Sequence, residues 1–185
     1  IQHELGYNTL GLADDEFPTE DRLPFIPYHR ESRRIHGKVR FTLNHIEKPY
    51  DYSLYRTGIA VGDYPVDHHH KRYTGEEELP DLHFFPIPSF TVPLGVMIPE
   101  NVENLIVAEK SISVSNIANG TTRLQPVVMQ IGQAAGALAS MMLTDGTGVS
   151  VRDVQKALLE AGSYLQPFID AKPDSPLFPA VQRIG

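Results

Sequence analysis

The sequence has 185 residues, about one domain's worth, of which 41% are hydrophobic and 21% are charged. This composition is typical of a globular chain and excludes a largely disordered one. The net charge of −7 disfavours general nucleic-acid binding, because an acidic surface repels phosphate backbones. Without cysteine, the chain has no disulfides, thiolate metal sites or cysteine nucleophiles.

The start of the sequence and its apolar runs bear on targeting to a membrane or for export. The chain begins at Ile1 and lacks a basic segment followed by an apolar one, the mark of a signal peptide. We therefore expect a fragment or a processed product, with the remainder of its own polypeptide upstream. No apolar run approaches the roughly 18 residues of a membrane span, so we expect no transmembrane segment.

The first half of the chain reads as strand-rich. Residues 38–43 alternate between polar and apolar side chains, which predicts a strand. Residues 59–61 form a short apolar run that ends at Gly62. The dense prolines between 83 and 99 favour edge strands and connectors, since proline cannot sit in a central strand.

The second half is more regular. Residues 104–108 predict a short buried strand, followed by a loop over 111–120. Apolar residues at helical spacing predict a long helix from Pro126 to about Leu143. Ser150 with Asp153 predicts the start of a second helix, ending at Gly162. The buried stripe of that helix is predicted as Val154, Leu158 and Ala161, and the proline-rich tail 163–185 as a surface wrap.

Two glycines lie inside the long predicted helix. Each costs about 1 kcal/mol relative to alanine in a helix interior, so Gly132 and Gly136 need a physical reason. With Ala135 and Ala139 they give the helix a smooth face. We expect another backbone or a flat ligand to approach this face closely.

Three runs carry a resemblance to a known family. They are Leu-Ile-Val-Ala-Glu-Lys at 105–110, Gly-Thr-Thr-Arg-Leu-Gln-Pro at 120–126 and Ile-Gly-Gln-Ala-Ala-Gly at 131–136. Together they resemble the C-terminal flavin-binding segment of FAD-dependent oxidoreductases. The stretches 28–35 and 62–70 also resemble bacterial members of that group, which are sometimes labelled xanthan lyases.

The resemblance implies a mixed α/β fold, here an α+β fragment. Residues 1–98 would be the strand-rich portion of a substrate domain. Residues 99–145 would be the C-terminal strand–loop–helix of a Rossmann-like FAD domain, and residues 146–185 a helix and proline-rich tail. The Gly-x-Gly-x-x-Gly fingerprint is absent, so the half that grips the ADP moiety is expected upstream and the fragment alone is expected to be inactive.

The resemblance also implies a set of FAD contacts. Glu109, at the end of the predicted strand, would hydrogen-bond the ribityl or phosphate region. The positive end of the long helix, with the backbone amides near Leu124, Gln125 and Val127, would face the pyrimidine edge of the flavin, although Pro126 has no N–H. The remaining expected cofactor contacts are Thr121, Thr122, Arg123, Gly132 and Gln133.

A run of three histidines follows Asp67. In an extended segment His68 and His70 share one face, and either could take a hydroxyl proton while hydride passes to the flavin. A structural or surface role and a metal site remain open from the residues alone. Because three adjacent histidines seldom converge on one ion, we predict no metal site.

The arginines near residue 30 are the second candidate for substrate contact. Arg30 or Arg34 could bind an acidic substrate group, since a guanidinium matches a carboxylate with two parallel hydrogen bonds. The alternative is an internal pair with Glu31 on a solvated face.

The function that these features favour is hydride transfer from a hydroxyl-bearing substrate to FAD. A sugar-like substrate is drawn only from the family's label. One alternative is a polysaccharide lyase, with His68 or Tyr64 as base and Arg30 neutralising a uronate, although a lyase leaves the glycine-containing helix unexplained. The other is a non-catalytic carbohydrate-binding domain, with a platform of tyrosines at 50, 52, 55 and 64.

Overall fold

A computed structural model describes residues 33–67 and 84–183, all within one compact unit, Glu31–Gly185. The expectations for Arg30, His68 and His70 therefore fall outside the described residues. The same holds for residues 28–32 and 68–70 of the two stretches that resemble bacterial FAD-dependent oxidoreductases.

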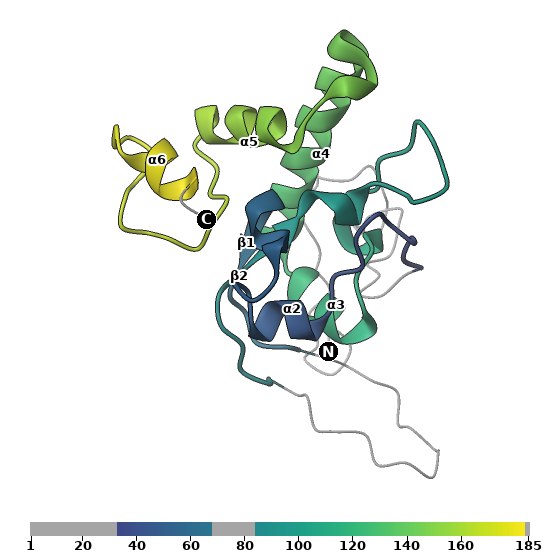
Figure 1. Ribbon diagram of the computed structural model, residues 1–185. Helices are drawn as coiled ribbons and strands as arrows, with labels where there is room; N and C mark the ends of the chain where they lie inside the picture. The colour runs from purple at the N-terminus through teal and green to yellow at the C-terminus, as the bar shows by residue number, and fades with distance from the viewer. Residues whose placement is uncertain (1–32, 68–83, 184–185) are drawn as a thin grey trace, which may run out of the picture. The chain divides into compact units, whose positions relative to one another are not determined.

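The described strands form a two-stranded antiparallel sheet (Figure 1). Strand β1, Gly58–Gly62, pairs with β2, Phe90–Pro93, so that Gly62 lies opposite Phe90 and Gly58 opposite Pro93, with an irregularity between Gly58 and Ala60. The apolar run at 59–61 lies in strand β1. The proline-rich segment, for which edge strands and connectors were predicted, contains β2. Two strands alone are marginal in water, so the sheet depends on the helices packed against it.

Five α-helices and four short 3-10 helices complete the described fold (Figure 1). The α-helices are α2 Leu43–Glu47, α3 Asn116–Thr122, α4 Gln125–Asp145, α5 Val151–Glu160 and α6 Phe178–Arg183. The 3-10 helices are η1 Ser53–Thr57, η2 Leu94–Met97, η3 Glu109–Ser111 and η4 Gly146–Gly148.

Helix α4 lies against β1 and α5 and supplies one wall of the core. Its inner face consists of residues at helical spacing, and Gly146 with φ 72° ends it. The two long helices are confirmed, including the Ser150–Asp153 cap of α5, although Ala161 is exposed because it lies one residue beyond the helix. The buried residues of the two helices include Val127, Ile131, Ala134, Leu138, Val154 and Leu158.

Among the described helices, the segment Gln125–Thr144 of α4 is long and apolar enough to cross a membrane by length and composition. The core helix of a soluble protein passes the same test, and one face of α4 packs against β1. This finding is therefore weak evidence for a membrane span.

Glutamine side chains join segments that are distant in the sequence. The amide of Gln130 on α4 binds both main-chain groups of Val61, at 2.9 and 3.1 Å. Gln155 on α5 donates to the carbonyl oxygens of Arg56 and Gly58, at 3.1 and 2.9 Å. Gln182 on α6 accepts from the amides of residues 165 and 166, both at 2.8 Å. These side-chain amides, of which Gln155 and Gln182 are buried, take over part of the role that further strands would play.

Two predicted strands are wrong. Residues 38–43 make only an isolated bridge at Phe41 and then enter α2, because the segment hydrogen-bonds to two different loops, at Gly95 and Ser113, and not along one strand. Residues 104–108 form no ladder with another described strand, and Val107 N–H bonds Met97 O at 2.8 Å. Leu105 is exposed and Asn104 has φ 55°, so the run is not a buried strand.

Helix α3 replaces the second half of the loop predicted over 111–120. Its residues have modest helix propensity, but Ser115 caps it by accepting from Ala118 N–H at 3.1 Å, and five of its seven residues are buried. The predicted strand–loop–helix is therefore an irregular segment with the short helix η3, followed by the two helices α3 and α4.

The tail is also more than a surface wrap, since Leu165, Gln166, Phe178 and Gln182 are buried. Mixed helices and a small antiparallel sheet agree with an α+β fragment.

Candidate functional site

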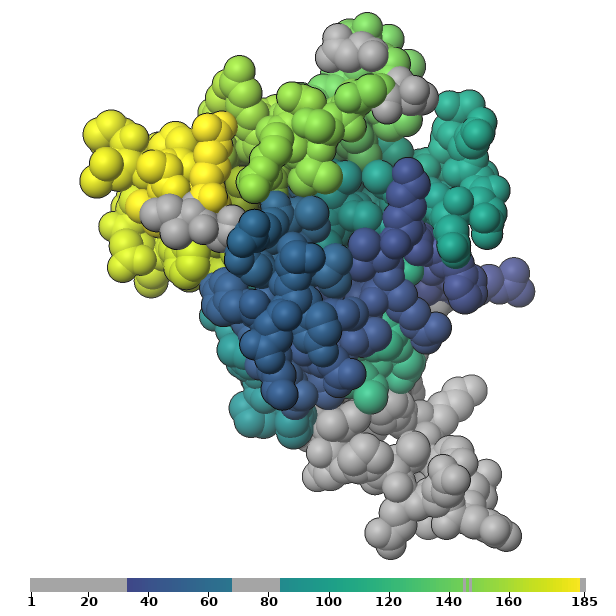
Figure 2. Space-filling model, in the orientation of Figure 1, coloured from purple at the N-terminus to yellow at the C-terminus, as the bar shows by residue number. Residues whose placement is uncertain are grey.

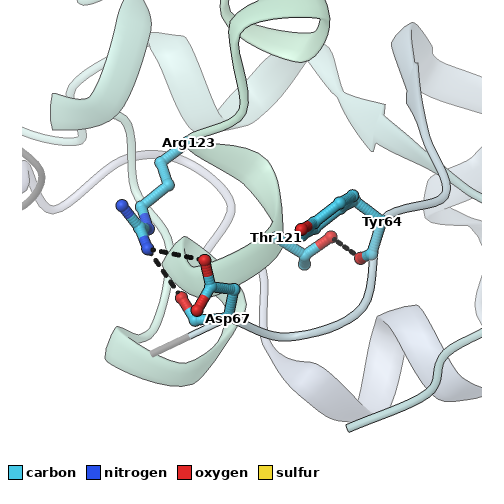
Figure 3. A network of polar contacts seen from close by, with 4 residues as sticks. All are labelled: Tyr64, Asp67, Thr121 and Arg123. Carbon is cyan, nitrogen blue, oxygen red and sulfur yellow. Dashed lines mark hydrogen bonds and ion pairs between the residues drawn. The ribbon is translucent and has the colours of Figure 1, made fainter. Parts of the chain in front are cut away.

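The turn between α3 and α4 is tied to the segment that follows β1 (Figure 3). Arg123 Nη2 donates to the main-chain oxygen of Asp67 at 2.8 Å and lies 3.5 Å from its carboxylate Oδ2. Thr121 Oγ1 donates to the carbonyl of Tyr64 at 2.5 Å, and the amide of Asp67 donates to Gly120 O at 3.2 Å. These four contacts fix residues 64–67 against the end of α3.

Buried polar atoms without a partner lie in the second half of α3 and in the turn that follows it. Asn119 is 1% exposed, and within the described part of the chain neither Nδ2 nor Oδ1 of its amide has a hydrogen-bond partner. The Nε of Arg123 is likewise buried and unpaired there. An unsatisfied buried polar group costs about 1–3 kcal/mol. The turn is therefore a place where a polar ligand would be stabilising.

The N-terminus of α4 follows directly. Its N-cap residue Leu124 makes no side-chain capping bond, and Gln125 and Pro126 are exposed. The first-turn amides of a helix lack intrahelical acceptors, and the positive end of the helix dipole favours an anion or a carbonyl oxygen there. Pro126 contributes no N–H, so the donors are those of its neighbours.

The two threonines predicted to contact the cofactor donate their hydroxyl hydrogens to main-chain oxygens of the protein itself. Thr121 and Thr122 are buried, and the hydroxyl of Thr122 donates to Ala118 O at 3.1 Å. Since the hydroxyl of Thr121 is bonded to Tyr64, both hydrogens are committed to main-chain oxygens. These residues hold the turn in place.

Glu109 does not end a strand. It lies in η3 with φ 66°, next to α4, and its carboxylate bonds Lys110 Nζ at 2.7 Å. The Glu109 side chain is 56% exposed, so it remains open to a ligand. Whether it contacts a cofactor stays a prediction.

The glycine face of α4 points outward. Both Gly132 and Gly136 are exposed, and a Cβ at either would meet no described atom within 4 Å. The close approach predicted for this face is thus not made by the described residues. The neighbouring Gln133 accepts from Ser163 Oγ at 2.9 Å and lines a cavity of about 510 Å³ near the end of β1.

The other candidates occupy separate places. Arg34 lines a small pocket beside the start of α3. The predicted tyrosines are divided, since Tyr50 contacts Tyr55 at 5.3 Å between ring centroids whereas Tyr64 contacts Phe84 at 6.3 Å. Among residues 33–67 and 84–183, no group of three or more His, Asp or Glu side chains could hold a metal ion.

Asn119 was missed by sequence reasoning. The predicted loop gave it no defined neighbour, whereas the Ser115 cap places it one turn before Arg123 on the same helix face. The cap residue, four positions before Asn119, was the signal that could have found it.

Comparison with models of protein families shows the family to which the chain belongs. The family model described as FAD dependent oxidoreductase matches residues 1–160. The chain therefore belongs to the FAD dependent oxidoreductase family, which implies an enzyme that binds FAD. Searches of curated proteins and of solved structures found no significant match.

Proposed function

We propose that this chain is the C-terminal portion of an oxidoreductase that takes hydride from a hydroxyl-bearing, sugar-like substrate. The observation that carries the proposal is the turn from Asn119 to Gln125, where unpaired buried polar atoms precede the open N-terminus of a 21-residue helix. FAD, when bound, supplies the acceptor for the hydride.

The residues of this turn fit the polar edge of a flavin ring. The side-chain amide of Asn119 offers one acceptor and two N–H donors, which complements an imide with its own N–H and carbonyls. The Nε–H of Arg123 adds a donor, and the α4 dipole favours the negative charge that the pyrimidine edge gains on reduction. Thr121, Thr122 and Asp67 would position the turn.

The outer face of α4 would continue the cofactor seat. At Gly132 and Gly136 no described side chain intervenes, so a flat ring or the upstream part of the polypeptide could lie close to the backbone. Leu124, Gln125 and Gln133 would border that surface, with Glu109 toward the ribityl chain. A Rossmann-like half with the missing glycine fingerprint would bind the ADP moiety.

Oxidation of a hydroxyl also needs a base. Loss of hydride from carbon leaves the hydroxyl proton to be removed, and His68 or His70 would accept it. Both follow Asp67, which the bond to Arg123 fixes beside the turn. Arg30 would bind the substrate.

The test is a visible absorption spectrum of the longest native form of the protein, desalted after purification. We expect flavin bands that survive desalting and that bleach anaerobically when a substrate is added. A protein that stays colourless after reconstitution with FAD contradicts the proposal and favours the lyase or the carbohydrate-binding alternative.

A further inference from the structure

Three arginines line one small pocket away from the α3–α4 turn. The pocket has a volume of about 270 Å³ and lies between the segment 33–40 and the loop that leads into α3. Figure 2 shows the first described residues, in purple, on the visible surface of the molecule. The lining residues with polar side chains are Arg33, Arg34, His36, Arg40, Ser113 and Asn116.

These arginines have no anionic partner in the described structure. The ion pairs found among residues 33–67 and 84–183 involve Lys110, Arg123 and Lys156, and Arg33, Arg34 and Arg40 make no side-chain hydrogen bond there. No carboxylate is among the described lining residues, although the chain carries a net charge of −7. Three neighbouring positive charges repel one another, and an anion between them would relieve that repulsion.

Both walls of the pocket are held by main-chain hydrogen bonds. Ile35 N–H donates to Ser111 O at 3.0 Å, and Phe41 N–H donates to Ser113 O at 3.0 Å. Ser115 N–H returns a bond to Phe41 O at 2.9 Å. The backbone that carries the arginines is therefore fixed before any ligand arrives, which lowers the entropic cost of binding.

We propose that this pocket binds the anionic group, a carboxylate or a phosphate, of a small molecule. Guanidinium groups bind both groups with paired, charge-assisted hydrogen bonds. The volume is at the lower limit of small-molecule sites, about 300 Å³, and suits a charged group better than a whole large ligand.

The pocket is distinct from the proposed flavin seat and does not depend on it. Asn116 of the pocket begins α3, whereas the proposed flavin seat begins at Asn119, one turn further along that helix, and continues past its end to Gln125. Asn116 and Asn119 lie about 5 Å apart along the axis of α3, and the two sites share no side chain. A protein without flavin can still show the anion site, and the reverse also holds.

The test is isothermal titration of the full chain with inorganic phosphate and, separately, with malonate, at low ionic strength. We expect saturable binding of at least one ion with a stoichiometry of one. Arg34→Gln and Arg40→Gln should each weaken it about tenfold or more, the loss expected for a charge-assisted hydrogen bond. Preference for phosphate or for malonate identifies the group.

Two further variants distinguish specific binding in this pocket from non-specific attraction of anions to positive charge. Arg34→Lys keeps the charge but not the planar fork, so we expect a smaller loss than in Arg34→Gln. Arg183→Gln removes an exposed arginine of α6 and should leave binding unchanged. The proposal is overturned if neither ion binds saturably, if Arg183→Gln weakens binding as much as the pocket variants, or if single-stranded DNA binds at these arginines while the small ions do not.

Discussion

Arg123 and Asp67 form a partly buried pair in which the guanidinium donates to the main-chain oxygen of the aspartate at 2.8 Å and lies 3.5 Å from its carboxylate. Their side chains are 8% and 17% exposed. The pair joins residues 56 positions apart and links the segment leading to His68 with the start of α4. The pair thus holds the described segment that ends at Asp67 against the turn of the proposed flavin seat.

Replacing the arginine of this pair should destabilise the fold. Arg123→Met removes the charge-assisted hydrogen bond to the main-chain oxygen of Asp67, so we expect a loss of about 1.5–3 kcal/mol in the free energy of unfolding. Urea denaturation measures it. Arg183→Met, at an exposed position, should change stability by less than about 0.5 kcal/mol. Equal effects of the two variants would contradict a structural role for the pair.

Asn119→Leu should separate stability from cofactor binding. It removes two unsatisfied buried groups at similar volume, so the flavin-free protein should be as stable as the native one or more stable. If the amide binds the flavin, affinity for FAD should fall about tenfold or more. Gln166→Leu is the contrast, because Gln166 Nε2 donates to Tyr55 O at 2.6 Å and its loss should destabilise the fold. Unchanged FAD affinity in Asn119→Leu would remove Asn119 from the site.

Gly136→Ala tests the outer face of α4. Among the described residues, the added Cβ meets no atom within 4 Å. Alanine is favoured over glycine in a helix interior by about 1 kcal/mol, so the thermal stability of the flavin-free protein should rise. If the face contacts the cofactor or the upstream half, FAD retention should fall in the same variant. Calorimetry and the flavin spectrum together decide this. A rise in stability with full flavin retention would mean that the face is free of both.

His45 should make stability depend on pH. Burial lowers the pKa of its imidazole from 6.5, and its Nδ1 accepts the Thr42 N–H at 3.0 Å in the cap of α2. A lowered folded pKa means that the unfolded chain binds more protons, so this contribution is present above pH 6.5 and is lost as the pH falls through the folded pKa. His45→Gln keeps an acceptor without titrating. In this variant, the urea concentration at the unfolding midpoint should vary less with pH between about pH 7 and pH 5 than in the native protein. If the midpoint varies with pH as much as in the native protein, His45 is excluded as the cause.

The long helices could be predicted because their signals are local. Apolar spacing marked α4, and the Ser150–Asp153 pair marked the start of α5. The run at 104–108 was misread because an apolar sequence reports hydrophobicity and not the presence of a neighbouring strand. Helix α3 was missed because burial of Asn119, Gly120 and Thr121 outweighs their weak propensity.

The candidate sites could also be predicted only where their residues lie close together in the sequence. The family resemblance located the turn at 120–126, but not the unpaired amide of Asn119 one step before it. Arg34, with Arg30, was predicted as a candidate for binding an acidic group, yet only the fold brings Arg33 and Arg40 beside residues 113–116. Spacing along the chain carries no information about that approach.

The glutamine bridges have a consequence for folding kinetics. Gln130, Gln155 and Gln166 bind partners 69 to 111 residues away, so the core is closed by contacts with long loops. Such contacts slow folding, since loop entropy is lost before the bonds form. During synthesis, the amides of residues 165 and 166 must wait for Gln182 to leave the ribosome. A nascent chain that pauses before α6 would therefore lack the Gln182 acceptor for these two amides and the buried side chain of Phe178.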